Sequence, residues 1–135
     1  MRRMVGGCLC GQVRYSAETE PVFTAICHCK NCQKQAGTAF TVVVAMPKST
    51  LSIQGSLKTF NDTGDSGKPV YRRFCGDCGS PIISDVDIMP EIVFLKAGTL
   101  DDTSWLNPTM QVWCDSIQPW VSLSGVMQQF PKMPA

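Results

Sequence analysis

The order of apolar and polar residues along the chain predicts short β-strands rather than helices. The clearest case is Thr38 to Ala45, a run of β-branched, aromatic and small residues that predicts a buried strand. Only Cys29 to Ala36, followed by Gly37, has the character of a short helix. Further strands are predicted at 12–17, 51–53, 57–60, 70–74, 82–86, 91–97, 112–114 and 120–123. The pattern predicts a mainly β fold of several short antiparallel strands with little helix.

Glycine, proline and polar residues separate these strands and predict the connections between them. Gly55-Ser56 lies between two predicted strands and predicts a hairpin that joins 51–53 to 57–60. Residues 61–69 are polar and glycine-rich, so they predict a surface loop. We see no internal repeat and no linker, and we expect residues 1–135 to form a single domain.

Composition excludes several classes of protein. With 44% hydrophobic and 17% charged residues, the chain is too apolar for a disordered protein. A formal net charge of +1 shows no footprint of nucleic-acid binding, and no apolar stretch is long enough to span a membrane. The N-terminal residues contain no apolar segment of a secretory signal, so we expect a cytoplasmic protein. Nothing in the sequence indicates an oligomeric state.

Eight cysteines are the unusual part of the composition. Seven of them form three tight groups with the patterns C-x-C, C-x-C-x-x-C and C-x-x-C. Metal sites cluster cysteines in this way because two ligands from one short turn lower the entropy cost of closing the site. Disulfide frameworks usually spread their cysteines, and they need an oxidising compartment. Zinc is favoured over an iron–sulfur cluster because no group has the usual cluster spacing.

Two of the groups together make a complete set of four thiolate ligands. Cys8 and Cys10 are flanked by glycines that permit a tight turn, and Cys75 and Cys78 form a C-x-x-C knuckle. Four protein ligands leave no position open for a substrate. We therefore expect a structural zinc site that joins the N-terminal part of the chain to its middle.

The third group has three cysteines, Cys27, Cys29 and Cys32, within six residues. Three protein ligands plus one open position are typical of a catalytic zinc, which can bind an incoming thiol or polarise a carbonyl. Two alternatives would close this site: Cys114 or His28 as a fourth ligand. In a further alternative, the segment from Cys27 to Cys32 forms a redox-active C-x-x-C disulfide and binds no metal.

These motifs resemble those of the glutathione-dependent formaldehyde-activating family, which includes the centromere protein V domain. The resemblance covers about residues 5 to 131. It rests on the three cysteine groups in their order and spacing, and on these further segments: Gly37-Thr-Ala-Phe, Arg72-Arg73-Phe74-Cys75, Ala97-Gly98-Thr99-Leu100-Asp101-Asp102 and Pro119-Trp120.

The resemblance implies a zinc-bound β-tent fold with two zinc sites. A structural zinc would be bound by Cys8, Cys10, Cys75 and Cys78. A second, exposed zinc would be bound by Cys27, Cys29 and Cys32, with glutathione nearby. The implied reaction joins glutathione to formaldehyde as S-hydroxymethylglutathione, a carbon–sulfur lyase activity. The chain departs from the family at Gln111, where the family often has histidine.

Two functions of different classes follow from these residues. An enzyme would bring the sulfur of glutathione, or of a related thiol, to the cysteine group for attack on a small aldehyde. Glutathione carries two carboxylates, and the candidate cations for them are Arg72, Arg73, Lys30 and Lys34. A non-catalytic binding module would instead have a closed second site, or none, and an exposed apolar patch. The candidates for that patch are Trp105, Trp113 and Trp120.

Overall fold

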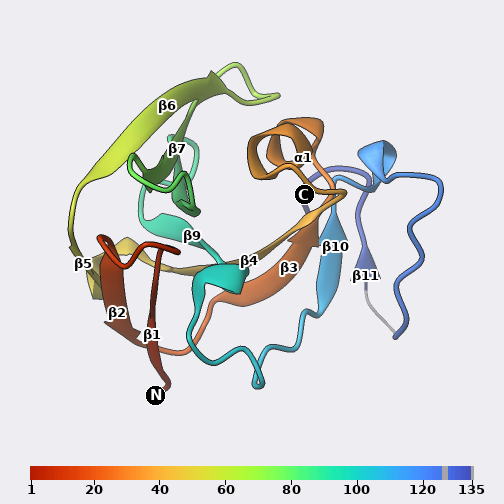
Figure 1. Cartoon of the computed structure of the whole chain (residues 1–135). Coiled ribbons are helices and arrows are strands. Elements are labelled where there is room, and N and C mark those ends of the chain that lie inside the picture. Colours follow the sequence, from red (N-terminus) through yellow and green to blue (C-terminus); the bar gives the residue numbers. More distant parts are fainter. Residues whose placement is uncertain (126–127, 135) are drawn as a thin grey trace.

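Two β-sheets form the framework of the computed structural model, which describes residues 1–125 and 128–134. The smaller sheet has three antiparallel strands in the order β1 (Arg3–Gly7), β2 (Arg14–Glu18) and β5 (Leu51–Gln54). It stands beside β6 and β7 of the larger sheet (Figure 1).

The larger sheet has eight strands and curves across the molecule (Figure 1). Most neighbours are antiparallel, but β10 pairs in parallel with both β3 and β11. The prediction of a mainly β fold is confirmed. In spatial order the strands are β11 (Gln128–Gln129), β10 (Met110–Val112), β3 (Phe23–Cys27), β4 (Thr41–Pro47), β9 (Ile92–Lys96), β8 (Pro81–Val86), β7 (Pro69–Cys75) and β6 (Leu57–Thr63).

One α-helix, α1 (Lys30–Ala36), follows β3 after two residues, as the sequence predicts. It ends at Gly37, whose φ of 68° is left-handed and whose N–H donates to the carbonyl of Gln33. Cys32 and Gln33 form its buried face. In the part of the chain that the structure describes, the remaining elements are three short 3₁₀ turns: η1 (Lys48–Thr50), η2 (Ala97–Thr99) and η3 (Cys114–Ser116).

The two faces of the larger sheet have different environments, and β9 shows this most clearly. Val93 and Leu95 are fully buried in the main core, which also includes residues of the smaller sheet. Phe94 and Lys96 alternate with them and face the other side. That second face carries an apolar cluster made of Phe94 and residues of β3 and β4, and it forms the floor of the cavity described below.

The predicted hairpin at Gly55-Ser56 is wrong. β5 pairs with β2 in the smaller sheet, whereas β6 pairs with β7 in the larger one. Gly55 has a φ of 100°, and a Cβ there would lie 2.2 Å from the carbonyl oxygen of Gln12. Gly55 lies where the chain passes from the smaller sheet to the larger one. Only glycine fits there, because the backbone adopts a positive φ and lies close to the backbone of Gln12.

Other element boundaries also differ from the sequence pattern. β6 and β7 extend into the predicted loop 61–69, and residues 120–123 form no strand. The predicted strand 112–114 contributes only its first residue to β10, because Trp113 adopts a left-handed φ of 58° and η3 begins at Cys114. The sequence pattern predicts no strand at β1, β3 or β11. Among the described residues, no helix has the length and apolar character needed to cross a membrane.

Candidate functional site

Four cysteine sulfurs, those of Cys8, Cys10, Cys75 and Cys78, meet where the two sheets come together, and all lie within 4.8 Å of one another. The sulfurs of Cys8 and Cys10 are 3.6 Å apart, and those of Cys10 and Cys75 are 3.8 Å apart. Four sulfurs at about 2.3 Å from a tetrahedral zinc would be separated by about 3.8 Å. The four-cysteine cluster could therefore hold a metal ion, and its dimensions fit zinc.

Tight turns on both sides build this cluster. After β1 the chain turns back, so that the N–H of Cys8 donates to the carbonyl of Val13 at 3.0 Å. At the end of β7 the N–H of Cys75 donates to the carbonyl of Ser80 at 2.9 Å. Hydrogen bonding by Ser80 is the main cause that lowers the pKa of Cys78 to about 5. These turns bring the thiols of both segments together, where they can share one metal ion.

The third cysteine group lies at the other end of the molecule, between β3 and α1. Cys27 is the last residue of β3, Cys29 immediately precedes α1, and Cys32 is on the buried face of α1. The sulfurs of Cys27 and Cys32 are 3.8 Å apart. In residues 1–125 and 128–134, only the four-cysteine cluster has three or more potential ligand atoms all within 4.8 Å. The sulfurs of the three-cysteine group are thus spaced more widely than those of the four-cysteine cluster.

Negative charge in this group is favoured on Cys32. Hydrogen bonds from the thiols of Cys27 and Cys29 lower the pKa of Cys32, and the positive charges of Lys96 and Arg72 lower it further despite burial. The thiols of Cys29 and Cys32, together with burial, raise the pKa of Cys27. The arrangement favours a thiolate at Cys32, in the first turn of α1, with a protonated thiol at Cys27 beside it.

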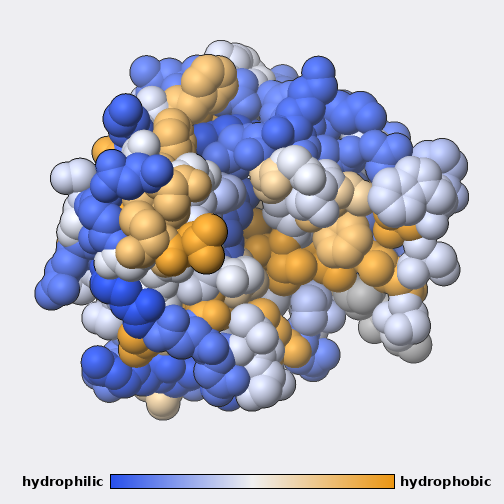
Figure 2. All heavy atoms as spheres, in the orientation of Figure 1, coloured by the Kyte–Doolittle hydropathy of each residue, from blue (hydrophilic) through white to orange (hydrophobic). Residues whose placement is uncertain are grey.

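A cavity of about 550 Å³ opens in front of these cysteines. Its floor is the larger sheet, and its sides are α1 and the loop between β6 and β7 (Figure 1). Hydrophilic residues cover much of the upper surface where those two elements lie, while apolar residues reach the surface below them (Figure 2). Most of the wall is apolar, as is usual for small-molecule sites. The three cysteines, Lys30, Arg72 and Lys96 supply polar and ionisable groups to it. Further polar side chains come from Thr63, Asp65, Ser66, Lys68 and a few other residues.

The predicted cations separate into two sets. Arg72 is buried in the cavity wall, where its Nε donates to Asp62 at 2.9 Å and its Nη1 donates to Cys32 at 3.4 Å. Lys30 lines the same cavity at an exposed position. Arg73 alternates to the opposite face of β7 and pairs with Asp85, and Lys34 points away from the cavity into a shallow surface depression.

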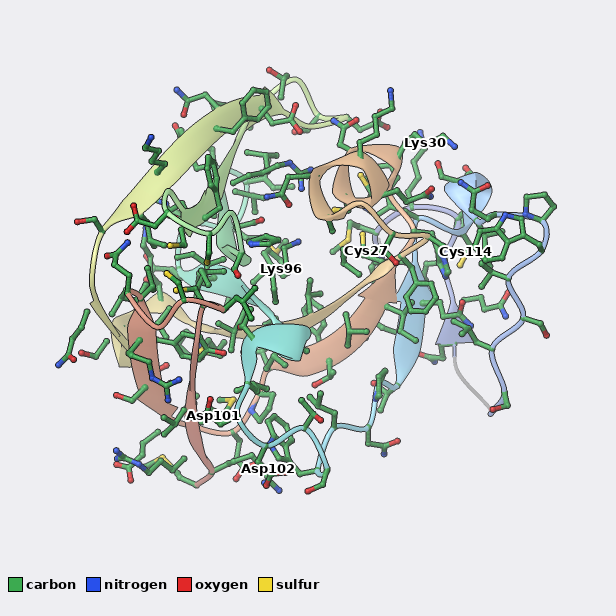
Figure 3. All side chains as sticks on the ribbon, viewed as in Figure 1. Cys27, Lys30, Lys96, Asp101, Asp102 and Cys114 are labelled. Atoms are coloured by element: carbon green, nitrogen blue, oxygen red, sulfur yellow. The ribbon has the colours of Figure 1, made fainter. Side chains whose placement is uncertain are left out.

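Neither proposed fourth ligand lies at the three-cysteine group. His28 is fully buried, and its Nε2 is 2.8 Å from Oε1 of Gln111. The thiol of Cys114 instead contacts the carbonyl of Gln111 at 3.6 Å, and neither residue lines the cavity (Figure 3). Gln111 thus supports His28 from β10 and does not line the cavity.

The three tryptophans do not form one exposed patch. Trp105 packs against the main core, with the guanidinium of Arg2 4.3 Å from its ring centre. Trp113 lines the cavity, and Trp120 is 73% exposed beside the surface depression near α1. The apolar surface expected of a binding module is therefore reduced to a single exposed tryptophan among these three.

Sequence reasoning missed two buried polar residues of the cavity, Lys96 and Ser84. Both lie within predicted strands, at 91–97 and 82–86, where a polar side chain reads as solvent-facing. In the structure Lys96 is 6% exposed and Ser84 is also 6% exposed. The one available signal was that Lys96 directly follows the apolar run Ile92-Val-Phe-Leu. If the strand stays buried to its end, the lysine side chain lies in the protein interior.

The protein is thus mainly β, with a four-cysteine cluster that could hold a metal ion and a separate cavity lined by three further cysteines. A family model described as glutathione-dependent formaldehyde-activating enzyme matches residues 3–116. The chain belongs to this family, and the resemblance seen in its sequence is confirmed.

Curated relatives and a solved structure agree with this assignment. Proteins of Aspergillus flavus and Aspergillus oryzae, both named "Putative glutathione-dependent formaldehyde-activating enzyme", are 27% identical over 115 residues, which is 82% of this chain. The match spans only 60% of the length of these relatives. A crystal structure of a Rhodobacter sphaeroides protein superposes with a TM-score of 0.60 at 21% identity, covering 78% of this chain and 92% of that one. It supports the fold alone.

Proposed function

We propose that this protein joins glutathione, or a related thiol, to formaldehyde or another small aldehyde, as an S-(hydroxymethyl)glutathione synthase-like carbon–sulfur lyase. The observation that carries the proposal is the meeting of Cys27, Cys29 and Cys32 with a buried Arg72 at one end of a mostly apolar cavity. Such a site can hold a thiolate away from bulk water and beside a fixed positive charge. Membership of the family supports the same reaction class.

Zinc has a place in this proposal at both cysteine groups. Cys8, Cys10, Cys75 and Cys78 would hold a structural ion that ties the sheets together, since their four sulfurs leave no ligand position free. Cys27, Cys29 and Cys32 would hold the second ion. When bound there, zinc would lower the pKa of an incoming thiol or polarise a carbonyl oxygen.

The residues of the chain would then orient the two substrates. Arg72 fixes Cys32 by a hydrogen bond and is itself held by Asp62, so the thiolate end of the cavity is rigid. Lys30 and Lys68 line the cavity at exposed positions and can receive the carboxylates of glutathione. The apolar wall excludes water from the aldehyde, which would otherwise be drawn towards its hydrate.

The test is the rate at which glutathione and formaldehyde combine and separate, because the uncatalysed addition is already easy. Exchange between free glutathione and its adduct can be measured at equilibrium by magnetisation-transfer NMR with catalytic amounts of reduced, zinc-loaded protein. We expect acceleration by the unaltered protein and its loss in Cys29→Ser. Cys114→Ser is the matched control, because this thiol lies outside the cavity.

Exchange that the unaltered protein does not accelerate, with formaldehyde or with larger aldehydes, would contradict the proposal. Equal acceleration by Cys29→Ser would also contradict it.

A thiol-redox function is the second candidate, and the separation of 3.8 Å between the Cys27 and Cys32 sulfurs favours it. In that reaction two thiols would give a disulfide and two protons, with two electrons passing to an oxidant such as glutathione disulfide. Incubation with glutathione redox buffers followed by mass spectrometry separates the two functions. A Cys27–Cys32 disulfide that forms reversibly in cytosolic-type buffers would favour the redox function.

A further inference from the structure

Lys96 is a buried lysine without a partner. It is 6% exposed, and its Nζ makes no hydrogen bond or ion pair with any described residue. Buried lysines are normally paired, because removing an ammonium group from water is costly. Burial lowers the pKa of Lys96, the negative charge of Cys32 opposes this effect, and the positive charge of Arg72 adds to it. An unpaired buried ammonium group on a cavity wall is a candidate for ligand binding.

Ser84 is a second unsatisfied group on the same wall. It is 6% exposed, and its hydroxyl oxygen is buried without a hydrogen-bond partner. Ser84 of β8 pairs with Phe94 of β9, so Ser84 and Lys96 are diagonal neighbours on one face of the sheet. Diagonal neighbours are within reach of each other when one side chain is long. Two donors that lack acceptors thus face the same part of the cavity.

The cysteine group lies across the cavity from these donors. Lys96 of β9 is separated from β3, which ends in Cys27, by the single strand β4. In Figure 3 the side chain of Lys96 extends towards the side where Cys27 lies. A small group placed between them would have sulfur on one side and N–H and O–H donors on the other.

The rest of this wall is apolar. Phe94 and Phe23 pack edge to face, with ring centres 6.1 Å apart, and Ala25 and Val43 lie with Phe94 in one buried cluster. All four residues line the cavity. A one-carbon aldehyde leaves this surface uncovered, whereas an aldehyde with a hydrocarbon substituent would bury it.

We propose that Lys96 and Ser84 bind the carbonyl oxygen of an aldehyde whose hydrocarbon substituent packs against Phe23, Val43 and Phe94. This inference rests on the proposed function and names its second substrate as an apolar aldehyde larger than formaldehyde. The thiolate sulfur forms a bond to the carbonyl carbon, and the π electron pair of the carbonyl moves to oxygen. Lys96 and Ser84 donate hydrogen bonds to that oxygen as its charge develops. A solvent proton, equivalent to the one released by the thiol, completes the hemithioacetal.

The binding arm of the test uses hexanoate, an unreactive oxyanion with a hydrocarbon tail, and formate, which has no tail. We expect hexanoate to shift cavity resonances in NMR titrations at an affinity at least about tenfold above that of formate, because the tail buries apolar carbon. Lys96→Met should weaken hexanoate about tenfold or more, as loss of a charge-assisted hydrogen bond does. Lys34→Met should not, since Lys34 is exposed and lies outside the cavity.

The kinetic arm compares hexanal with formaldehyde in the glutathione exchange measurement. Lys96→Met should lower kcat for hexanal about tenfold or more, the loss expected for an oxyanion donor. Phe94→Ala should raise KM for hexanal and leave KM for formaldehyde unchanged. The matched control is Lys34→Met, which removes an exposed lysine outside the cavity. A thermal melt shows whether each variant is folded. Lys96→Met should melt no lower than the unaltered protein, because it removes an unpaired buried charge.

The two arms separate this inference from the function on which it rests. Lys96-dependent binding of hexanoate without any acceleration of thiol addition would overturn the proposed function and leave the oxygen-binding site standing. Acceleration of formaldehyde and hexanal addition that is unchanged in a folded Lys96→Met would overturn the inference and leave the function standing. Absent or Lys96-independent binding of hexanoate would also overturn the inference.

Discussion

The guanidinium of Arg72 donates a hydrogen bond from Nη1 to the sulfur of Cys32 over 3.4 Å, and both side chains are buried. The same guanidinium donates from Nε to Asp62, which also accepts from Asn31 on α1. Asp62 keeps a lowered pKa despite its partial burial, because these donors and the N–H of Thr63 stabilise its charge. One arginine thus links the sheet, the helix and the thiol.

Replacing Arg72 by lysine tests this link. Lysine keeps the charge but cannot donate to Asp62 and Cys32 together from a planar fork. We expect alkylation of Cys32 by iodoacetamide at neutral pH, in reduced protein whose three-cysteine group is free of metal while the four-cysteine cluster keeps its ion, to slow several-fold because its thiolate is less stabilised. Arg73→Lys is the control, since Arg73 points to the other face and pairs with Asp85. Equal rates in both variants would show that Arg72 does not influence Cys32.

Metal removal tests the four-cysteine cluster. Cys75 is fully buried there, and structural zinc sites contribute on the order of 10 kcal/mol of folding free energy in peptides. We expect Cys75→Ser to lose one zinc per chain and its cooperative thermal transition, as measured by metal analysis and circular dichroism. Cys114→Ser should retain both the metal content and the melting temperature. A folded, cooperatively melting Cys75→Ser without zinc would contradict the structural role.

Tyr15 gives a prediction for alkaline pH. Its burial raises the pKa to about 12, above the ordinary value of 10.0 for a tyrosine in water. A folded-state pKa raised above the unfolded value gives stability that is complete below pH 10 and is lost as the pH rises towards 12. We expect Tyr15→Phe to lose about 1 kcal/mol at pH 7 with its hydrogen bond to Thr99.

That variant should also show a shallower loss of stability above pH 10, measured by denaturant unfolding across the pH range. Parallel curves of stability against pH for the two proteins would show that folding does not raise the pKa of Tyr15.

Gln111 gives a prediction about stability alone. Its Oε1 is paired with Nε2 of His28, and Nδ1 of His28 already lacks a partner. Gln111→Leu would leave the buried imidazole without this hydrogen bond, which costs about 1–3 kcal/mol. We expect lower stability in urea with unchanged hexanoate binding, since Gln111 does not line the cavity. A loss of hexanoate binding in a fully folded variant would contradict this separation.

The local character of the chain was largely readable from its residues. α1 and the strands β2, β4, β7, β8 and β9 lie within a few residues of their predicted positions. Their pattern reflects packing on a pleated surface, which acts over a few residues. The sequence also predicts that the C-x-C and C-x-x-C turns come together, because their four thiols make a complete set of zinc ligands.

What depends on distant partners could not be read in advance. The hairpin at Gly55 failed because strand pairing is decided by other strands, here β2 and β7, which the turn residues do not specify. The cavity face of β9 was missed because a lysine at a strand end reads as solvated until the opposite wall is known. Cys114 and His28 lie near the three-cysteine group in sequence or by topology, yet backbone turns direct them elsewhere.

The crossing at Gly55 has a consequence for the order in which the protein folds. Cys10 and Cys75 are separated by 65 residues, and the strand that completes the smaller sheet lies between them in the chain. During synthesis, Cys8 and Cys10 therefore remain exposed thiols without their partner ligands until the segment with Cys75 and Cys78 has left the ribosome. Closing so long a loop is slow relative to local structure formation. The nascent chain consequently has an interval in which oxidation, or a metal held by only two ligands, competes with the native arrangement.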